Sequence, residues 1–411
     1  MNYAPFLIFL LIIAAMLGES SVFTLFYLLA GAYIVGNWWS RSGIGAVRFK
    51  REFTRRAFHG ESIPVRLEIE NASRLPVVWL RLHESLPVEL ITPNFIRQVI
   101  SLGAHGREQF EYTLQANKRG YYRIGPLFLN SGDVFGVAAE QAREGAHDYL
   151  TVYPKIVPLT GVALPSHSPL GTLKHTQPIF EDPARVMGKR DYVSGDSLRR
   201  VDWKATAASG RLQVKQFEPS IALEALIALD LRDDSYDRRA RYDDSELAIV
   251  VAASVANYII NQKQPVGLLT NAKDASPPSF PPHSQTPTHS PVLQPSSGAS
   301  LPAHKSRPHL MRLLEILACA QTSEDAPALT DLLPNQIAAL PWGATLILIT
   351  GQAGDSLLDS LFHARRAGLN AVVILVGHGK GFSAFQQRAA RFGFEVYEVA
   401  REQDMVSPST L

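Results

Sequence analysis

Three carboxylates and one lysine in a short charged segment have the residue types that metal-dependent hydrolysis requires. Asp202 and Lys204 flank Trp203, and Asp196 and Glu218 lie close by in the sequence. In metal-dependent nucleases two carboxylates hold Mg²⁺ while a lysine helps to orient the attacking water. The Asp-x-Lys spacing is short and common by chance, and no pair of carboxylates on predicted strands accompanies it. A metal-dependent hydrolase or nuclease is therefore the alternative hypothesis.

The whole segment, residues 188–218, alternates charges of both signs with large aromatic rings. Its charged residues include Arg190, Asp191, Asp196, Arg199, Arg200, Asp202, Lys204, Arg211, Lys215 and Glu218, and its rings are Tyr192, Trp203 and Phe217. Charges that leave water need partners, so the pattern predicts an ion-pair network that fixes the segment to a neighbouring domain. Trp203 is predicted to be a buried anchor with its indole N–H paired. Recognition of a partner protein by the same face is the second interpretation.

The order of these residues resembles a bacterial family, domain-of-unknown-function family 58. The resemblance rests on Arg190-Asp191-Tyr192, Gly195-Asp196, Arg199, Asp202-Trp203-Lys204 and the run from Arg211 to Glu218. It implies a membrane-anchored protein with a von Willebrand factor A-like domain, and it implies work beside a MoxR-type AAA+ ATPase. The resemblance points to an architecture and a partner more than to a reaction.

The resemblance also implies a loop where A-type domains often hold Mg²⁺, at the end of the predicted strand before Asp230. The usual ligands are an Asp-x-Ser-x-Ser loop, a threonine and a later Asp-Gly, because hard cations need converging oxygens. Here Arg232 and Asp234 replace the two serines, and Gly351-Gln352 follows the later strand. The Arg232 cation opposes metal binding, so we expect a degenerate site without metal. Asp230 still marks the crevice where α/β sheets bind ligands, and a metal-dependent adhesion domain is a third hypothesis.

The first 40 residues are predicted to form two transmembrane helices. Tyr3–Leu17 and Ser21–Trp39 hold no charge, and the second run, 19 residues long, spans about 28 Å as a helix. Six basic residues follow at once, namely Arg41, Arg48, Lys50, Arg51, Arg55 and Arg56. The positive-inside rule then predicts a hairpin with both ends in the cytoplasm. We expect a multi-pass protein of the bacterial inner membrane, with the lipid bilayer as one partner.

Residues 45–157 are predicted to form an all-β sandwich. Ile63, Val65, Leu67 and Ile69 alternate with polar residues, and Val78, Leu80 and Leu82 do the same. A period of two, punctuated by glycine and asparagine turns, is typical of short strands with one buried face.

The remainder is predicted to be a connector followed by an α/β domain. Residues 158–220 read as an extended connector that contains the charged segment. Residues 221–411 alternate apolar strands with helices, which predicts a Rossmann-type, mostly parallel sheet covered on both faces. Residues 273–308, rich in Pro, Ser and His, are predicted to be a disordered insert.

Composition narrows the possible functions. The 411 residues suffice for two or three domains, and a net charge of +2 gives no basic field for nucleic acid. The single cysteine, Cys319, is predicted to be buried on a helix face. No Ser-His-Asp order, P-loop, Gly-rich dinucleotide loop or Cys-x-x-Cys occurs. We therefore predict a non-enzymatic scaffold without cofactor, whose oligomeric state the sequence leaves open.

Overall fold

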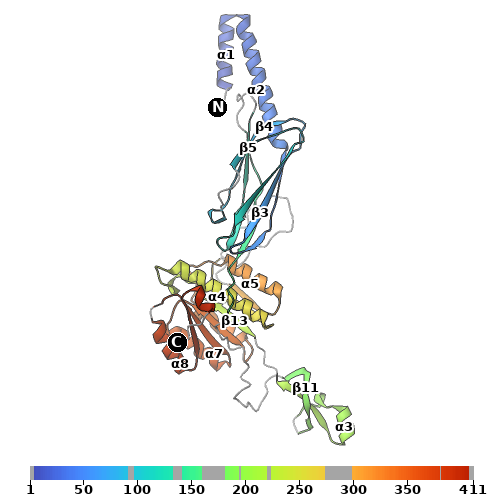
Figure 1. Ribbon diagram of the computed structural model, residues 1–411, viewed down its shortest axis with the longest axis vertical. Coiled ribbons are helices and arrows are strands. Elements are labelled where there is room, and N and C mark those ends of the chain that lie inside the picture. The colour runs from blue at the N-terminus through green and yellow to red at the C-terminus, as the bar shows by residue number, and fades with distance from the viewer. Residues whose placement is uncertain are drawn as a thin grey trace. The chain divides into compact units, whose positions relative to one another are not determined.

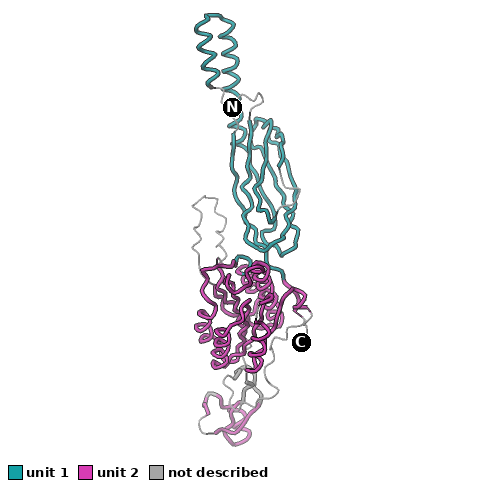
Figure 2. Tube along the Cα trace, turned by 90° about the vertical axis from the view of Figure 1, so that its left-hand side faces the viewer, with its two compact units in different colours: residues 1–155, 317–319 teal, residues 156–316, 320–411 magenta. Residues whose placement is uncertain are grey.

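The computed structural model describes most of the chain, and its residues fall into two compact units. The described residues are 4–90, 97–132, 141–159, 181–193, 196–219, 224–273, 299–379 and 381–406. Unit 1 holds Met1–Lys155 with Leu317–Cys319, and unit 2 holds Ile156–Ile316 with Ala320–Leu411 (Figure 2).

Unit 1 begins with two apolar helices, α1 (Ala4–Leu17) and α2 (Ser20–Ala46), joined at Gly18 (Figure 1). Gly18 has a φ of 65°, a backbone conformation that glycine adopts without steric cost. Among the described residues α2 alone is long and apolar enough to cross a membrane. The 14 residues of α1 reach about 21 Å, short of the hydrocarbon thickness. One candidate span thus stands where the sequence predicted two.

The rest of unit 1 is built from strands, in agreement with the alternating pattern. They are β1 (Val47–Glu52), β2 (Arg56–Phe58), β3 (Ser62–Asn71), β4 (Val77–Glu84), β5 (Arg97–Leu102), β6 (Arg107–Gln115), β7 (Gly120–Ile124), β8 (Leu127–Ser131), β9 (Gln141–Glu144) and β10 (Asp148–Tyr153). They form sheets of order β1-β3-β6, β2-β10-β7 and β5-β4-β8-β9. One hydrophobic core takes residues from all three sheets.

One predicted strand face is partly wrong. In β3 the residues Ile63, Val65, Leu67 and Ile69 are buried as predicted, but in β4 the side chain of Val78 is 37% exposed while Val77 is buried. The pairing of β4 with β5 shifts register between Val77 and Leu80. A bulge places an extra residue in the strand and breaks the simple alternation.

Unit 2 contains a six-stranded sheet of order β15-β14-β13-β16-β17-β18. Its strands are β13 (Ala225–Leu229), β14 (Val266–Thr270), β15 (Ala299–His304), β16 (Thr345–Thr350), β17 (Asn370–Val376) and β18 (Glu395–Val399). All neighbours pair in parallel except β15, which runs antiparallel to β14 at the edge. The sheet is therefore mixed, and its parallel part was predicted from the uninterrupted apolar runs.

Helices cover this sheet. They are α4 (Arg241–Asn261), α5 (Arg307–Cys319), α6 (Leu329–Ala339), α7 (Asp355–Arg366), α8 (Phe382–Arg391) and α9 (Glu402–Val406). Residues of α6, α7 and α8 share one core with alternate strand residues, and α4 packs on β13, β16 and β17. Cys319, at the end of α5, is buried as predicted.

Part of the expected disordered insert is ordered. Residues 299–304 form β15 and α5 begins at Arg307, because an apolar alternation (Leu301, Ala303) and a Ser306 N-cap with Pro at the start of the helix follow the Pro- and Ser-rich run. Residues 274–298 of the insert and residues 160–180 of the expected connector lie outside the described residues.

Candidate functional site

The charged segment folds as a small module of its own, which we call the signature module (residues 181–219). Strands β11 (Glu181–Asp191) and β12 (Gln213–Pro219) pair antiparallel, with Lys189 opposite Lys215 and Asp191 opposite Gln213. Between them lie a 3₁₀ turn (Leu198–Arg200) and helix α3 (Trp203–Ser209). The helix ends at Gly210, whose φ of 68° suits a glycine cap.

Asp202 and Asp196 hold the module together through separate contacts. The Asp202 carboxylate accepts a 3.1 Å hydrogen bond from the Ala205 amide as the N-cap of α3, and it lies 3.0 Å from Lys189 Nζ. Asp196 accepts two 2.7 Å bonds from the Arg190 guanidinium, a bidentate arrangement. The Ala205 amide, then Lys189, holds the pKa of Asp202 below its ordinary value, and the hydrogen bond from Arg190 lowers the pKa of Asp196.

The predicted burial of Trp203 is wrong. Its side chain is 68% exposed, and Leu198 and Val193 are exposed to 66% and 61%. The described core of the module consists of Val201 and Val214, which are 6% and 2% exposed. Two valines cannot enclose an indole, so the ring at the first position of α3 projects into solvent. These two ion pairs join residues of the module itself, and the expected network that fixes the segment to a neighbouring domain stays a prediction.

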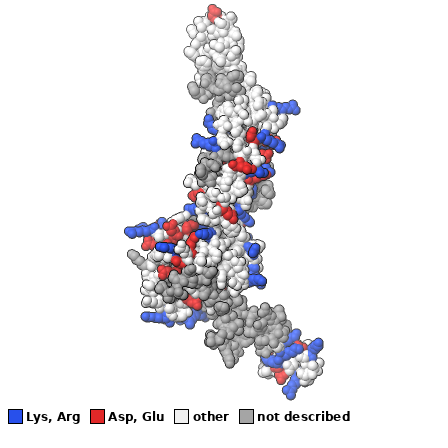
Figure 3. All heavy atoms as spheres, viewed as in Figure 1, with Lys and Arg blue, Asp and Glu red and all other residues white. Residues whose placement is uncertain are grey.

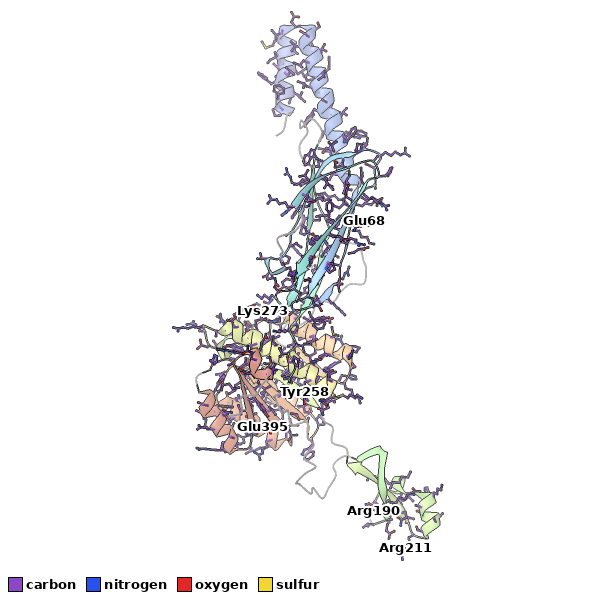
Figure 4. All side chains as sticks on the ribbon, viewed as in Figure 1. Glu68, Arg190, Arg211, Tyr258, Lys273 and Glu395 are labelled. Carbon is purple, nitrogen blue, oxygen red and sulfur yellow. The ribbon has the colours of Figure 1, made fainter. Side chains whose placement is uncertain are left out.

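The other predicted signature residues differ in their contacts and in their exposure. Asp191 accepts a hydrogen bond from the Gln213 side chain, and the Tyr192 amide donates to the Leu212 carbonyl. Lys204 is exposed. Gly195 and the side chains of Arg199 and Glu218 lie outside the described part of the chain. Figure 4 marks Arg190 on β11 and Arg211 just before β12.

Asp196 and Asp202, two of the residues proposed for hydrolysis, have separate partners. Asp196 binds Arg190, whereas Asp202 caps α3 and contacts Lys189. Across the described ranges, no group of three or more His, Cys, Asp or Glu side chains is arranged to hold a metal ion. This arrangement lacks the converging carboxylates that two-metal or one-metal hydrolysis needs.

A second polar site lies where the parallel strands of unit 2 end, and Asp230 is at its centre. The Asp230 carboxylate is 6% exposed. Its Oδ2 accepts hydrogen bonds from Ser235 Oγ at 2.7 Å and Thr350 Oγ1 at 3.0 Å. Its Oδ1 accepts from Asn271 Nδ2 at 2.8 Å and from the Arg232 amide at 3.2 Å.

These four donors match the four acceptor positions of a carboxylate, so protein groups already satisfy Asp230. Asp234, the other predicted position, is 73% exposed and lies 3.1 Å from Arg232 Nη2, away from this cluster of bonds. The two predicted positions, Asp230 and Asp234, thus have separate partners, and the degenerate site without metal stays a prediction. The hydroxyl that donates to Asp230 belongs to Ser235, one position later than the serine of the usual A-type pattern.

Sequence reasoning missed two members of this sheet-edge site, Asn271 and Thr350. A usable signal exists, because each comes at the end of an apolar parallel strand, as Asp230 does.

Asp244, in the first turn of α4, is buried beside Gly377. Burial raises its pKa, and the neighbouring His378 opposes this rise.

Fold and sites together show one helix, among the described residues, that is long and apolar enough to cross a membrane, several structural units and an exposed, ion-paired module. Residues 188–293 match the model of the family described as Protein of unknown function DUF58. The match covers about a quarter of the chain, and the resemblance predicted from the signature segment is confirmed.

One curated protein is similar to part of this chain. The chain is 22% identical over 230 residues to "Uncharacterized protein YeaD" of Bacillus subtilis (strain 168), which covers 54% of this chain and 56% of that protein. The chain thus matches only about half the length of this curated relative.

Solved structures overlap only in part. An aerotolerance-related membrane protein from Bacteroides fragilis NCTC 9343 has a TM-score of 0.30 at 12% identity, over 44% of this chain and 94% of that one. Native alpha-2-macroglobulin from Escherichia coli has a TM-score of 0.23 at 16% identity, over 29% and 20%.

Proposed function

We propose that this protein is a membrane-anchored, non-enzymatic scaffold that docks a protein partner through its signature module. The exposure of Trp203 carries the proposal. Exposed tryptophan is costly to leave in water and is enriched at the centre of protein interfaces. Among the described side chains of the module, Val201 and Val214 are buried while the indole faces outward.

The ionic contacts of the module support this role. Arg190–Asp196 and Lys189–Asp202 fix the loops that carry Val193, Leu198 and Trp203. A surface that is rigid before binding loses less conformational entropy when it docks. Residues 188–218 also hold seven Lys or Arg against four Asp or Glu, so the partner surface would be acidic around an apolar pocket.

The anchor would be the helical pair at the amino-terminus. We propose that residues 1–40, which include α1 and most of α2, enter the inner membrane as a hairpin with both ends cytoplasmic. Residues 45–157 would then form a cytoplasmic β-sandwich, residues 158–220 a connector with the signature module, and residues 221–411 a von Willebrand factor A-like domain. The antiparallel edge strand β15 beside five parallel strands supports the last assignment. The absence of any charge from residue 20 to residue 40 supports the first.

The partner that the family resemblance implies is a MoxR-type AAA+ ATPase. The test uses the full chain in detergent and the purified MoxR-type ATPase of the same organism as the probe. We expect binding by the wild-type chain, loss of binding by Trp203→Ala and unchanged binding by Phe392→Ala, which truncates a ring that is 47% exposed on unit 2. Equal binding by wild-type and Trp203→Ala would contradict the docking role of the module.

A further inference from the structure

A membrane-spanning α2 fixes the depth of its own carboxyl end. Glu19 and Arg41 bound its apolar stretch, and residues 20–40 between them hold no charge. From Ser20 to Trp39 the helix rises about 28 Å, close to the hydrocarbon thickness of about 30 Å. A tilt of the helix would shorten this projection and draw Trp39 towards the lipid. Trp39 therefore lies at the boundary between the acyl chains and the headgroups.

A hydrogen bond joins this level of the helix to the loop between β3 and β4. The indole Nε1 of Trp39 donates to the Pro76 carbonyl at 2.9 Å. Pro76 is exposed and ends the loop, which begins at Ala72. The headgroup region adds roughly 5–8 Å on each side of the hydrocarbon. Because the Pro76 carbonyl is within hydrogen-bond distance of Trp39, this end of the loop lies at the depth of the headgroups.

The last turns of α2 are built into the hydrophobic core of the strand part. Ile44 is 6% exposed and belongs to the same core as Val77, the first residue of β4. Gly43 is buried, and a Cβ at this position would lie 3.5 Å from Val77 Cγ2. The Ala72 amide donates to the Ala46 carbonyl at 3.1 Å. These contacts couple the depth of the loop to the depth of the helix.

Arg143 closes the carboxyl end of α2. Its Nη1 lies 2.8 Å from the Val47 carbonyl and 3.3 Å from the Gly45 carbonyl. The last carbonyls of a helix lack partners within it, and the Arg143 side chain supplies donors for them. Strand β1 begins at the residue after the helix ends, so no linker separates the apolar helix from the strand part.

Asn71 holds the β3–β4 loop in one shape. It is fully buried, and its Nδ2 donates to the Leu75 carbonyl at 2.8 Å and to the Gly103 carbonyl at 2.9 Å. Its Oδ1 accepts from the Ser73 amide and hydroxyl at 3.1 Å and 2.8 Å. The His105 amide, in the β5–β6 turn, donates to the Ser73 carbonyl at 3.1 Å. The loop is therefore fixed by protein groups and needs no lipid to order it.

The loop offers a surface that suits the lipid–water interface. Arg74 and Pro76 are exposed and Leu75 is half-buried. Residues 71–78 contain no Asp or Glu, so lipid phosphates meet no like charge in this segment. Figure 3 shows the apolar helices as almost uncharged surface, with Lys and Arg atoms appearing on the strand part. On the helix itself, Trp38 is 59% exposed and has the amphipathic ring typical of a membrane interface.

The direction of β3 provides an internal control for depth. Val47, directly after α2, pairs with Asn71, and Glu52 pairs with Arg66, so β3 leads away from the end of the helix. The strand has 10 residues and spans about 30 Å. His59, exposed in the β2–β3 turn, thus lies at the opposite end of the strand from the β3–β4 loop.

We propose that the β3–β4 loop, residues 72–76, is a second membrane contact that lies in the headgroup layer beside α2. Its partner is the phospholipid surface itself. The proposal rests on the membrane anchoring by α2 proposed above. It adds that the strand part of unit 1 stands end-on against the bilayer, with the β3–β4 loop at the lipid and the β2–β3 turn away from it.

Quenching by labelled lipid tests the loop contact. The full chain, with Cys319→Ser, carries one bimane-labelled cysteine, from Arg74→Cys in the loop or His59→Cys in the β2–β3 turn. It is placed in phosphatidylcholine nanodiscs in which part of the lipid has a nitroxide on its headgroup. We expect bimane at position 74 to be quenched several-fold more strongly than bimane at position 59. Ala104→Cys, in the β5–β6 turn, leaves the loop unaltered and should also be quenched more strongly than position 59.

Equal quenching at positions 74 and 59, whether strong or weak, would overturn the proposal, because an end-on strand part requires a difference. Ile34→Cys, at a position in α2 that is 66% exposed, separates the two claims when the nitroxide is on the acyl chain. No quenching at position 34 would contradict membrane anchoring and, with it, the loop contact. Quenching at position 34 without a difference between positions 74 and 59 would contradict the loop contact alone.

Discussion

Two ionic clusters of this protein use the same residue types but differ in how deeply their side chains are buried. In unit 1, Arg51 contacts Glu84 at 2.7 Å and Asp148 at 2.5 Å, and Tyr112 donates to Glu84. In the signature module, Arg190 holds Asp196 in a similar paired geometry. The side chains of Arg51 and Glu84 are fully buried, whereas that of Arg190 remains 45% exposed.

Burial decides what each cluster does. Burial lowers the pKa of Arg51, but Glu84 and Asp148 outweigh this and keep the pKa above its ordinary value. Burial, followed by the charge of Glu84, raises the pKa of the Tyr112 phenol. Such a cluster fixes a core and cannot reach a partner. The exposed cluster contributes little to stability but sets the shape of a surface that carries Trp203.

The largest expected effect comes from breaking the buried cluster. Glu84→Gln should lower the free energy of unfolding of unit 1 by about 3–5 kcal/mol, because it leaves the Arg51 charge buried without its main partner. Chemical denaturation of the full chain in detergent measures the change. Glu111→Gln, which breaks the exposed pair with Arg66, is the matched control and should cost about 1 kcal/mol or less. Similar losses for the two variants would contradict the contrast between buried and exposed pairs.

A slightly smaller effect is expected at the sheet edge. Asp230→Ala removes the acceptor of four donors and should destabilise unit 2 by about 2–3 kcal/mol, since buried hydroxyl and amide groups lose their partner.

Isothermal titration of the wild-type chain with MgCl₂ should give no heat beyond dilution. Micromolar Mg²⁺ binding that Asp230→Ala abolishes would instead support a metal-dependent adhesion domain.

Acidification should affect the signature module through Asp196 and Asp202. Both carboxyl groups have lowered pKa values in the folded chain, so their stabilising effect is complete above the unfolded value of about 4 and is lost as the pH falls through the lower folded values. Amide exchange of α3, corrected for intrinsic rates, should therefore accelerate only below about pH 4. Asp196→Asn with Asp202→Asn should remove this pH dependence, and acceleration already at pH 6 would point to another group.

The smallest expected effect on stability is that of Trp203→Ala. An exposed side chain away from caps and cores changes the free energy of unfolding by about 0.5 kcal/mol or less. Thermal melting of wild-type and variant checks this. A loss of several kcal/mol would mean that the indole is buried, as the sequence alone suggested.

The sequence predicted most of the secondary structure, because apolar period and turn residues are local signals. Alternation in Ile63–Ile69 identified β3 without knowledge of its neighbours. Signals were lost where one residue changed the pattern, as at the β4 bulge, or where a short strand directly follows a Pro- and Ser-rich run, as β15 does.

Sites were harder to predict, because they depend on what surrounds a residue. Trp203 was predicted to be buried from its type alone, yet it is 68% exposed at the start of α3. Asn271 and Thr350 lie 41 and 120 residues from Asp230 in sequence, and only the parallel order of the strands brings them together. The pairing of Arg190 with Asp196, six residues apart, was within reach of local reasoning.

Hydroxyl-radical footprinting of Trp203 tests the central claim most directly. Oxidation of Trp203 is compared between native membranes and the purified full chain in nanodiscs, with Trp342, which is 44% exposed, as the internal reference. A docking module predicts that Trp203 is oxidised several-fold more slowly in native membranes while Trp342 reacts at the same rate in both. Equal oxidation of Trp203 in the two preparations would contradict a partner seated on the signature module.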